Sequence, residues 1–164
     1  MIKNNIKALL IHIVISILSF ILSIIIHTSS AKWVSEEAAR QHHISMIQAS
    51  ILVIIVSLLL YYYLSRKFLT NQLSIIKNIL SLSIIWLIGI VLWLISFYIY
   101  LTEGTQILLN SGFWQLYSLY YGYCMSLVYE ITTTNPYIMI VFGIFPIIIM
   151  YLGMKKSSIT EGKK

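Results

Sequence analysis

A stripe of hydroxyl and imidazole side chains runs along the first apolar segment of the chain. His12, Ser16, Ser19, Ser23 and His27 follow one another at intervals of four and three residues. A helix therefore places all of them on one face. The stripe could be a polar pathway through a membrane, with His12 as its ionisable group. We favour the simpler interpretation, a packing surface, because small hydroxyl side chains let helices approach closely and form hydrogen bonds in lipid.

A second group of ionisable side chains comes after this segment. Glu36, Glu37, His42 and His43 lie close in sequence to His27 and could hold a metal ion or sense pH. Adjacent histidines on a helix point about 100° apart, however, which suits a single ion poorly. A solvated pair at the membrane interface is the simpler interpretation. The chain also lacks zinc-type Cys/His spacing, a glycine-rich phosphate loop and a GxSxG motif, so we predict no metal, no cofactor and no catalytic residue.

The composition is that of a membrane protein. Of the 164 residues, 59% are hydrophobic and 10% are charged, whereas soluble domains contain about 25% charged residues. The net charge is +6, but the basic residues lie in short clusters beside apolar runs, which indicates membrane topology rather than a nucleic-acid surface. Cys124 is the only cysteine, so no disulfide within the chain holds the fold. We expect the lipid bilayer as a partner, and no nucleic acid.

The clearest membrane segment is 79–101, which contains no Asp, Glu, Lys or Arg. As a helix this run is about 34 Å long, enough to cross a hydrocarbon core of about 30 Å. Similar runs predict an all-α integral membrane protein with a single domain, 1–164, and four transmembrane helices in a bundle, with spans near 7–27, 43–64, 75–101 and 137–153. The first run could be a signal peptide cleaved near Ser29 and Ala31. It is longer than the usual apolar core of about 7–15 residues, so we expect it to be retained.

Residues 113–129 differ from the four predicted spans. They are apolar and rich in tyrosine, and no Lys or Arg occurs between Lys77 and Lys155, as is typical of chain kept outside the cell. We therefore predict an aromatic-rich interfacial or re-entrant helix here, between the third and fourth spans, rather than a fifth span. The basic residues cluster instead at the N-terminus, in the connection 65–72 and in the C-terminal tail. This pattern predicts that both termini are cytoplasmic in a protein of the cell membrane.

Local features of the second and third helices follow from residue type. Ser35 is a suitable N-cap for the second helix, and the tyrosines 61–63 are expected to form an interfacial aromatic belt at its far end. Ser81, Gly89 and Ser96 fall close to one face of the third helix. We predict that these three small residues form a groove against which a neighbouring helix packs.

His12 is expected to belong to a polar layer inside the bundle. His12, Trp86 and Pro146 lie at similar distances from the cytoplasmic ends of their helices, about 9–12 Å. Pro146 lacks a backbone N–H and so frees the carbonyl of Phe142 within the last helix. The layer would join the His12 ring, the Trp86 indole and this carbonyl, and it would make Trp86 part of one candidate intramembrane polar site with His12 and the serines of the first helix.

These features favour a non-catalytic membrane protein that acts by binding a partner. Coupled transport usually needs carboxylates or basic groups at mid-membrane, and His12 is the only His, Lys, Arg or carboxylate well inside the predicted spans. A hydrolase needs a nucleophile beside a base, and the serines have only His12. We predict an accessory, regulatory or immunity-type subunit that associates with another membrane protein or with itself. The alternatives are a small oligomeric transporter or pore with a path lined by His12 and serines and, third, an intramembrane enzyme.

Overall fold

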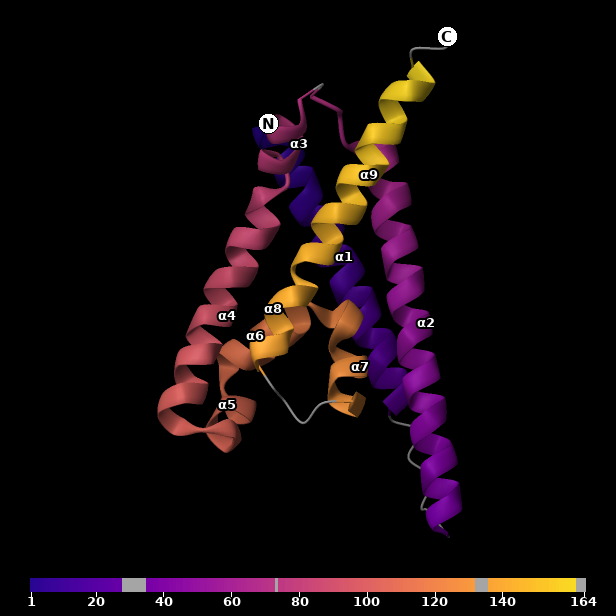
Figure 1. The fold of residues 1–164 in the computed structure, drawn as a ribbon, viewed down its shortest axis with the longest axis vertical. Helices are drawn as coiled ribbons and strands as arrows, with labels where there is room; N and C mark the ends of the chain where they lie inside the picture. Colours follow the sequence, from indigo (N-terminus) through magenta and orange to yellow (C-terminus); the bar gives the residue numbers. More distant parts are fainter. Residues whose placement is uncertain (28–34, 73, 132–135, 162–164) are drawn as a thin grey trace.

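The structure is a bundle of helices that run alongside one another. The computed structural model describes residues 1–27, 35–72, 74–131 and 136–161. Every regular element within these ranges is a helix, which confirms the predicted all-α class (Figure 1). In chain order the helices are α1 (Ile2–His27), α2 (Glu36–Phe68), α3 (Ile75–Leu80), α4 (Ser83–Glu103), α5 (Thr105–Asn110), α6 (Gly112–Tyr120), α7 (Gly122–Ile131), α8 (Pro136–Phe142) and α9 (Ile144–Glu161). The cleavage site considered at Ser29 and Ala31 lies outside the described residues.

Three helices of the described chain are long and apolar enough to cross a membrane. They are Ile2–Ile26, Glu36–Phe68 and Ser83–Glu103, and a shorter apolar helix covers Ile140–Met154. Large apolar side chains such as Val14, Leu52 and Leu87 are more than half exposed on the outside of the bundle. A helix that is hydrophobic all round is suited to a membrane rather than to water.

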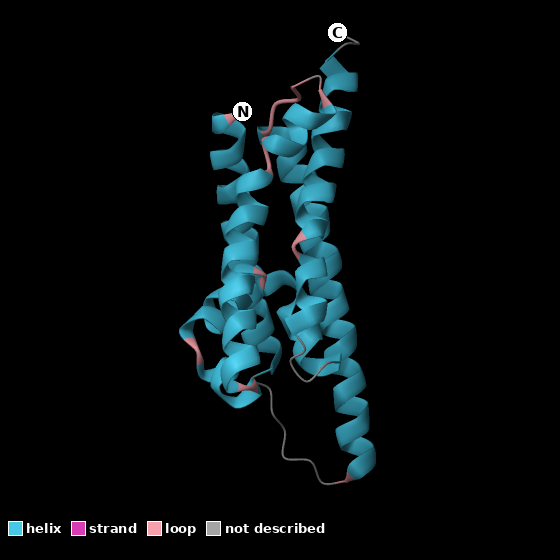
Figure 2. Cartoon of the chain, turned by 60° about the vertical axis from the view of Figure 1, so that its left-hand side comes forward, coloured by secondary structure: helices cyan, strands magenta, loops and turns pink. Residues whose placement is uncertain are grey.

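The two ends of the bundle differ in what they contain. The start of α1, the end of α9 and α3 lie at one end, and α5 lies toward the other, where the start of α2 projects beyond its neighbours (Figure 1). Figure 2 shows from another side that the long helices follow a common axis. α9 lies close to α2 at Gly153, where an added Cβ would lie 2.0 Å from the hydroxyl oxygen of Ser65. Small residues allow this contact, as they do between helices in lipid.

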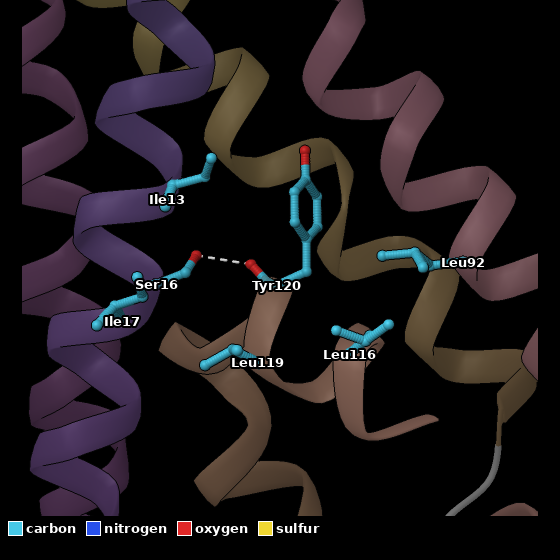
Figure 3. Close-up of a pocket in the computed structure, with 7 residues that line it drawn as sticks. All are labelled: Ile13, Ser16, Ile17, Leu92, Leu116, Leu119 and Tyr120. Carbon is cyan, nitrogen blue, oxygen red and sulfur yellow. Dashed lines mark hydrogen bonds between the residues drawn. The ribbon is translucent and has the colours of Figure 1, made fainter. Parts of the chain in front are cut away.

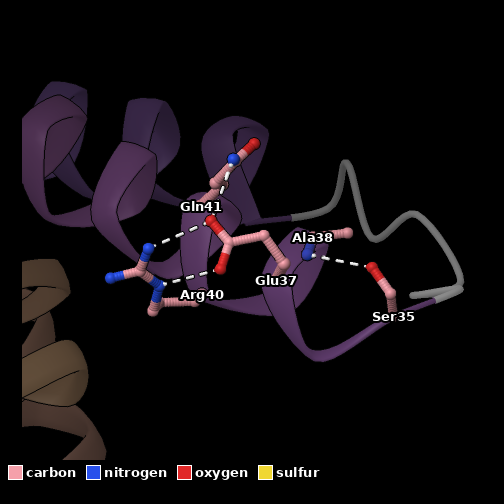
Figure 4. Close-up of polar contacts among 5 residues, drawn as sticks. All are labelled: Ser35, Glu37, Ala38, Arg40 and Gln41. Carbon is pink, nitrogen blue, oxygen red and sulfur yellow. Dashed lines mark hydrogen bonds and ion pairs between the residues drawn. The ribbon is translucent and has the colours of Figure 1, made fainter.

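The projecting start of α2 is capped as predicted. The Ser35 hydroxyl accepts a hydrogen bond from the backbone N–H of Ala38 at 3.2 Å (Figure 4). Glu37 pairs with Arg40 at 3.0 Å and accepts a further hydrogen bond from Gln41 at 3.1 Å. These contacts, with Arg40 the larger contribution, hold the pKa of the Glu37 carboxyl below its usual value. Since a carboxylate near a helix N-terminus also suits the helix dipole, this charge stabilises the first turn.

The third predicted span, 75–101, is not one helix. It breaks between α3 and α4, and the side-chain amide of Asn5 is inserted at the break. Asn5 donates to the Leu80 carbonyl at 3.0 Å and accepts from the Ile84 N–H at 3.3 Å. In an unbroken helix these two backbone groups would bond to each other. A side chain inserted into the hydrogen-bond ladder is a recognised cause of a kink, and the long helix therefore begins at Ser83.

The last predicted span, 137–153, is also interrupted. It consists of α8 and α9, joined at Gly143. Pro146 lies in the first turn of α9, so the Phe142 carbonyl has no helical donor, as its position in the sequence predicts. That carbonyl accepts a hydrogen bond from the Tyr123 hydroxyl. A side chain from another helix thus replaces the hydrogen bond that the Phe142 carbonyl loses at the break.

Residues 113–129, predicted as one helix, form two. The chain turns at Tyr121 between α6 and α7. α6 packs against α4, whereas α7 packs against α1 and α2. The turn reaches into the bundle, because a Cβ on Gly122 would lie 2.5 Å from the backbone oxygen of Ser16. The segment is therefore a helical hairpin whose tip contacts the middle of α1.

Candidate functional site

His12 is the buried ionisable residue at the centre of the bundle. Its side chain has no exposed surface, and its Nδ1 lies 2.8 Å from the hydroxyl oxygen of Tyr61 on α2. When the ring carries its proton on Nε2, the Tyr61 hydroxyl donates to Nδ1. The His12 Nε2 has no hydrogen-bond partner of normal geometry among the described residues.

Three tyrosine rings enclose the imidazole. The ring centroid of His12 lies 4.3 Å from that of Tyr120, 5.6 Å from that of Tyr121 and 5.8 Å from that of Tyr61. The first two contacts are edge-on and the third is stacked, arrangements that aromatic rings favour. Tyr120 and Tyr121 belong to the tip of the α6–α7 hairpin, so the hairpin closes the space around His12.

Two further side chains donate hydrogen bonds to backbone carbonyls at the hairpin tip. Ser16 donates from its hydroxyl to the backbone carbonyl of Tyr120 at 2.6 Å (Figure 3). The thiol of Cys124 donates to the carbonyl of Tyr121 at 3.2 Å. Ser16 is therefore bonded to a carbonyl and not to His12, so it is not paired with a base as a nucleophile requires.

The serine stripe of α1 faces the inside of the bundle. Ser16, Ser19 and Ser23 are all buried, and the hydroxyls of Ser19 and Ser57 lie 2.8 Å apart. Ser57 also donates to the carbonyl of its own helix at Val53, at 2.7 Å. The structure describes the backbone of His27 but not its side chain. Where the stripe is described, it packs α1 against its neighbours.

Trp86 is not brought together with His12. Its side chain is 42% exposed, and it lines a small pit on the outer face with Trp93 and Tyr121. The described contacts do not join His12 and the Phe142 carbonyl in one layer: His12 bonds to Tyr61, and the Phe142 carbonyl accepts from Tyr123. Tyr61 and Tyr123 thus make the hydrogen bonds that were expected of the Trp86 indole.

The residues of the predicted packing groove have three different roles. Gly89 faces the hairpin tip, since an added Cβ would lie 1.8 Å from the Tyr121 hydroxyl oxygen. Ser81 donates to the carbonyl of Asn78 at 2.7 Å, in the turn between α3 and α4. Ser96 is buried, and its hydroxyl has no hydrogen-bond partner within the described ranges. The neighbour that fills the space at Gly89 is the ring of Tyr121 and not a whole helix face.

The second ionisable cluster is spread along α2 and α7. His43 Nδ1 lies 2.8 Å from a carboxylate oxygen of Glu130 near the end of α7. Glu37 pairs with Arg40 instead. In the part of the chain that the structure describes, no three His, Cys, Asp or Glu side chains converge on a common point that could hold a metal ion.

The role of the tyrosines in this site was not predicted from the sequence. Tyr61 was expected in an interfacial belt, but it is fully buried against His12, while Tyr63 on the same helix is 60% exposed. Tyr121 and Tyr123 were expected at the outer interface and are buried as well. A usable signal was Gly122 within the run YYGYC, since a glycine can mark a close approach of backbones.

Apolar grooves lie on the outside of the bundle around this site. One, of about 170 Å³, lies between α1, α4 and α6 and is lined by Ile13, Ser16, Ile17, Leu92, Leu116, Leu119 and Tyr120 (Figure 3). A second, of about 160 Å³, lies between α1 and α7 and is lined by Phe20, Ser23, Ile24, Met125, Ser126 and Tyr129. Comparison of the chain with protein-family models, with curated proteins and with solved structures finds no match.

Proposed function

We propose that the chain is a multi-pass protein of the cell membrane with four crossings. α1, α2 and α4 supply three, and α8 with α9 supplies the fourth. The uncharged part of these two helices, 136–154, is about 29 Å long as a helix, close to a bilayer core of about 30 Å. The α6–α7 hairpin is then re-entrant: it enters from the side of α5 and returns to it, with its tip at His12.

The distribution of charge supports an orientation for this arrangement. The end of the bundle that holds the start of α1 and α3 is rich in basic residues. They are Lys3, Lys7, Arg66, Lys67 and Lys77. Basic residues are retained preferentially on the cytoplasmic side. We therefore propose that both termini are cytoplasmic, with α5 and the start of α2 outside.

We further propose that the protein is non-catalytic and acts by binding a membrane partner, as an accessory, regulatory or immunity-type subunit. The observation that supports this most is that three polar contacts at depth join side chains to other helices of the bundle. His12 bonds to Tyr61, Ser19 to Ser57, and Tyr123 to the Phe142 carbonyl. Groups used in this way hold a bundle together, whereas a relay or an active site directs polar atoms toward a substrate path.

The groove between α1, α4 and α6 is the surface proposed for the partner. Its outer residues Ile17 and Leu116 are 41% and 52% exposed. A photo-crosslinking amino acid at either position is expected to give a discrete protein adduct in the native membrane. The matched controls are Leu59 and Leu52 on α2, which are 63% and 61% exposed and should crosslink only to lipid. Equal adducts from both sets, or none from the groove, would contradict a partner at this surface.

A small transporter or pore that works as an oligomer is the second candidate. It is favoured by one observation, the buried His12 Nε2 that makes no normal hydrogen bond among the described residues, with the serines of α1 on the same face. A flux assay on the reconstituted protein distinguishes the two: the binding protein conducts nothing above the level of empty vesicles.

A further inference from the structure

Glu130, near the end of α7, is a mostly buried carboxylate beside a histidine. Its side chain is 17% exposed, and one of its oxygens lies 2.8 Å from Nδ1 of His43 on α2, whose side chain is 51% exposed. A carboxylate withdrawn from water needs a compensating charge or hydrogen bonds. A protonated His43 supplies a charge-assisted hydrogen bond, whereas a neutral His43 supplies at most an ordinary one. The strength of the contact therefore depends on the protonation of His43.

The two ends of α7 are held in different ways. At the hairpin tip, Tyr123 donates to the Phe142 carbonyl and Gly122 lies against the backbone of Ser16, and neither contact involves a charge. At the other end, near the projecting start of α2 (Figure 1), Glu130 joins α7 to α2 through His43. A change in the charge of His43 should therefore affect the outer half of α7 and leave the tip in place.

The surroundings of this contact contain few other charges. α2 and α7 pack against α1, α6 and α9. α6 contains no charged residue or histidine, and the charges of α9 lie toward its C-terminal end, away from α7 (Figure 1). On α2, Glu37 and Arg40 pair with each other. The other ionisable groups at this end of the packed helices are His42 on α2, Tyr129 on α7 and His27 at the end of α1.

We propose that the His43–Glu130 contact makes the attachment of α7 to α2 depend on the pH outside the cell. At about pH 5 to 6 a histidine can carry its proton while a carboxyl group is ionised, so the ion pair holds the outer half of α7 against α2. As the pH rises toward about 8, His43 loses its charge and this stabilisation is lost. Because Ser126 and Tyr129 line the groove between α7 and α1, the same change loosens one wall of that groove.

The inference rests on the proposed membrane placement for the side that senses pH, and not on the partner-binding role. Hydrogen exchange along α7 tests it in nanodiscs, where both ends of the bundle meet the buffer and the orientation of the chain does not matter. The reference is His43→Lys, because lysine keeps its charge over about pH 5.5 to 8. The sequence of α7 is the same in both chains, so the intrinsic pH dependence of exchange cancels.

Relative to this reference, we expect exchange at 127–130 to become about three- to fivefold faster between about pH 5.5 and 8, as suits an ion pair with one half-exposed partner. Exchange near the tip, at 122–125, should not change relative to the reference. High salt should reduce the difference between the two pH values, since it screens an exposed charge.

Substitutions at and around the contact identify the groups responsible. His43→Gln and Glu130→Gln should each remove the pH dependence, because neither can form the ion pair. His42→Gln, which removes the adjacent histidine, and Glu103→Gln, which removes a carboxylate at the end of α4, should keep it. The proposal is overturned if the unmodified chain follows His43→Lys at every pH, or if the pH dependence persists in Glu130→Gln or disappears in His42→Gln. The crosslinking experiment tests partner binding separately.

Discussion

The phenolic oxygen of Tyr121 occupies the space that a side chain at position 89 would need. A Cβ built on Gly89 would lie 1.8 Å from this oxygen, and a Cβ on Gly143 would lie 2.7 Å from it. The two glycines come from α4 and from the junction of α8 and α9. Tyr121 is thereby held between α4 and the junction of α8 and α9, and the hairpin tip is fixed beside His12.

Gly89→Ala is therefore expected to destabilise the protein. The added methyl group forces the Tyr121 ring to move, and overpacking of this kind costs about 1–3 kcal/mol. Thermal unfolding in mild detergent measures the loss. Gly112→Ala is the matched control, because a Cβ at Gly112 meets no atom within 4 Å. The double variant Gly89→Ala, Tyr121→Phe should regain only part of the stability, since a ring carbon of residue 121 remains 2.7 Å from the new Cβ.

Asn5→Ala is expected to loosen the junction of α3 and α4. It removes hydrogen bonds to the Leu80 carbonyl and the Ile84 N–H, which are worth about 0.5–1.5 kcal/mol each. Hydrogen exchange at Ile84 should become faster. Asn110→Ala is a suitable comparison, because Asn110 bonds only within its own helix, to the Gln106 carbonyl at 3.1 Å. An unchanged exchange rate in Asn5→Ala would show that the break does not depend on this amide.

Cys124 is expected to resist thiol reagents in the folded protein. Its side chain has no exposed surface and its thiol donates to the Tyr121 carbonyl. In a Cys124→Ala background, a cysteine placed at the exposed Gln106 of α5 should react with a membrane-impermeant reagent from outside the cell, and one at Lys3 only after the membrane is opened. Reaction at Lys3 in intact cells would reverse the proposed orientation.

His12→Gln is expected to be tolerated, whereas His12→Leu is not. Glutamine can still bond to the Tyr61 hydroxyl, but leucine leaves that buried hydroxyl without a partner, at a cost of about 1–3 kcal/mol. Unfolding and assembly should follow this order with little change over about pH 5 to 8, the range in which a histidine can titrate. If the unmodified protein instead conducts ions in a pH-dependent way and both variants abolish the flux, His12 carries protons and the transporter is the correct assignment.

The sequence predicts the helices better than their interruptions. Long uncharged runs leave little alternative to membrane-length helices, and Ser35 caps α2 as residue type requires. The break at Ser81–Leu82 could not be predicted, because the side chain that bonds to the backbone there is Asn5, which lies far away in sequence. The break near Pro146 was partly visible, since proline frees the Phe142 carbonyl, but the donor that meets it is Tyr123 of another helix.

The candidate site was likewise predicted only in part from the sequence. Periodicity alone puts His12 and the serines of α1 on one face, and the structure buries that face. The partners of His12 could not be read from spacing, because tyrosine suits both a membrane interface and a buried hydrogen bond. Only the three-dimensional path of the hairpin decides that Tyr121 lies at the centre and Tyr63 at the surface.

The position of Tyr121 between Gly89 and Gly143 also implies an order in which the helices assemble during synthesis. Gly89 is synthesised before the hairpin and Gly143 after it, so the hairpin emerges from the ribosome when only one of its two supports exists. Its tip has both supports only after Gly143 has been synthesised. A nascent chain released after residue 131 should therefore hold the α6–α7 segment loosely and expose it to quality-control proteases, and addition of the remaining segment should protect it.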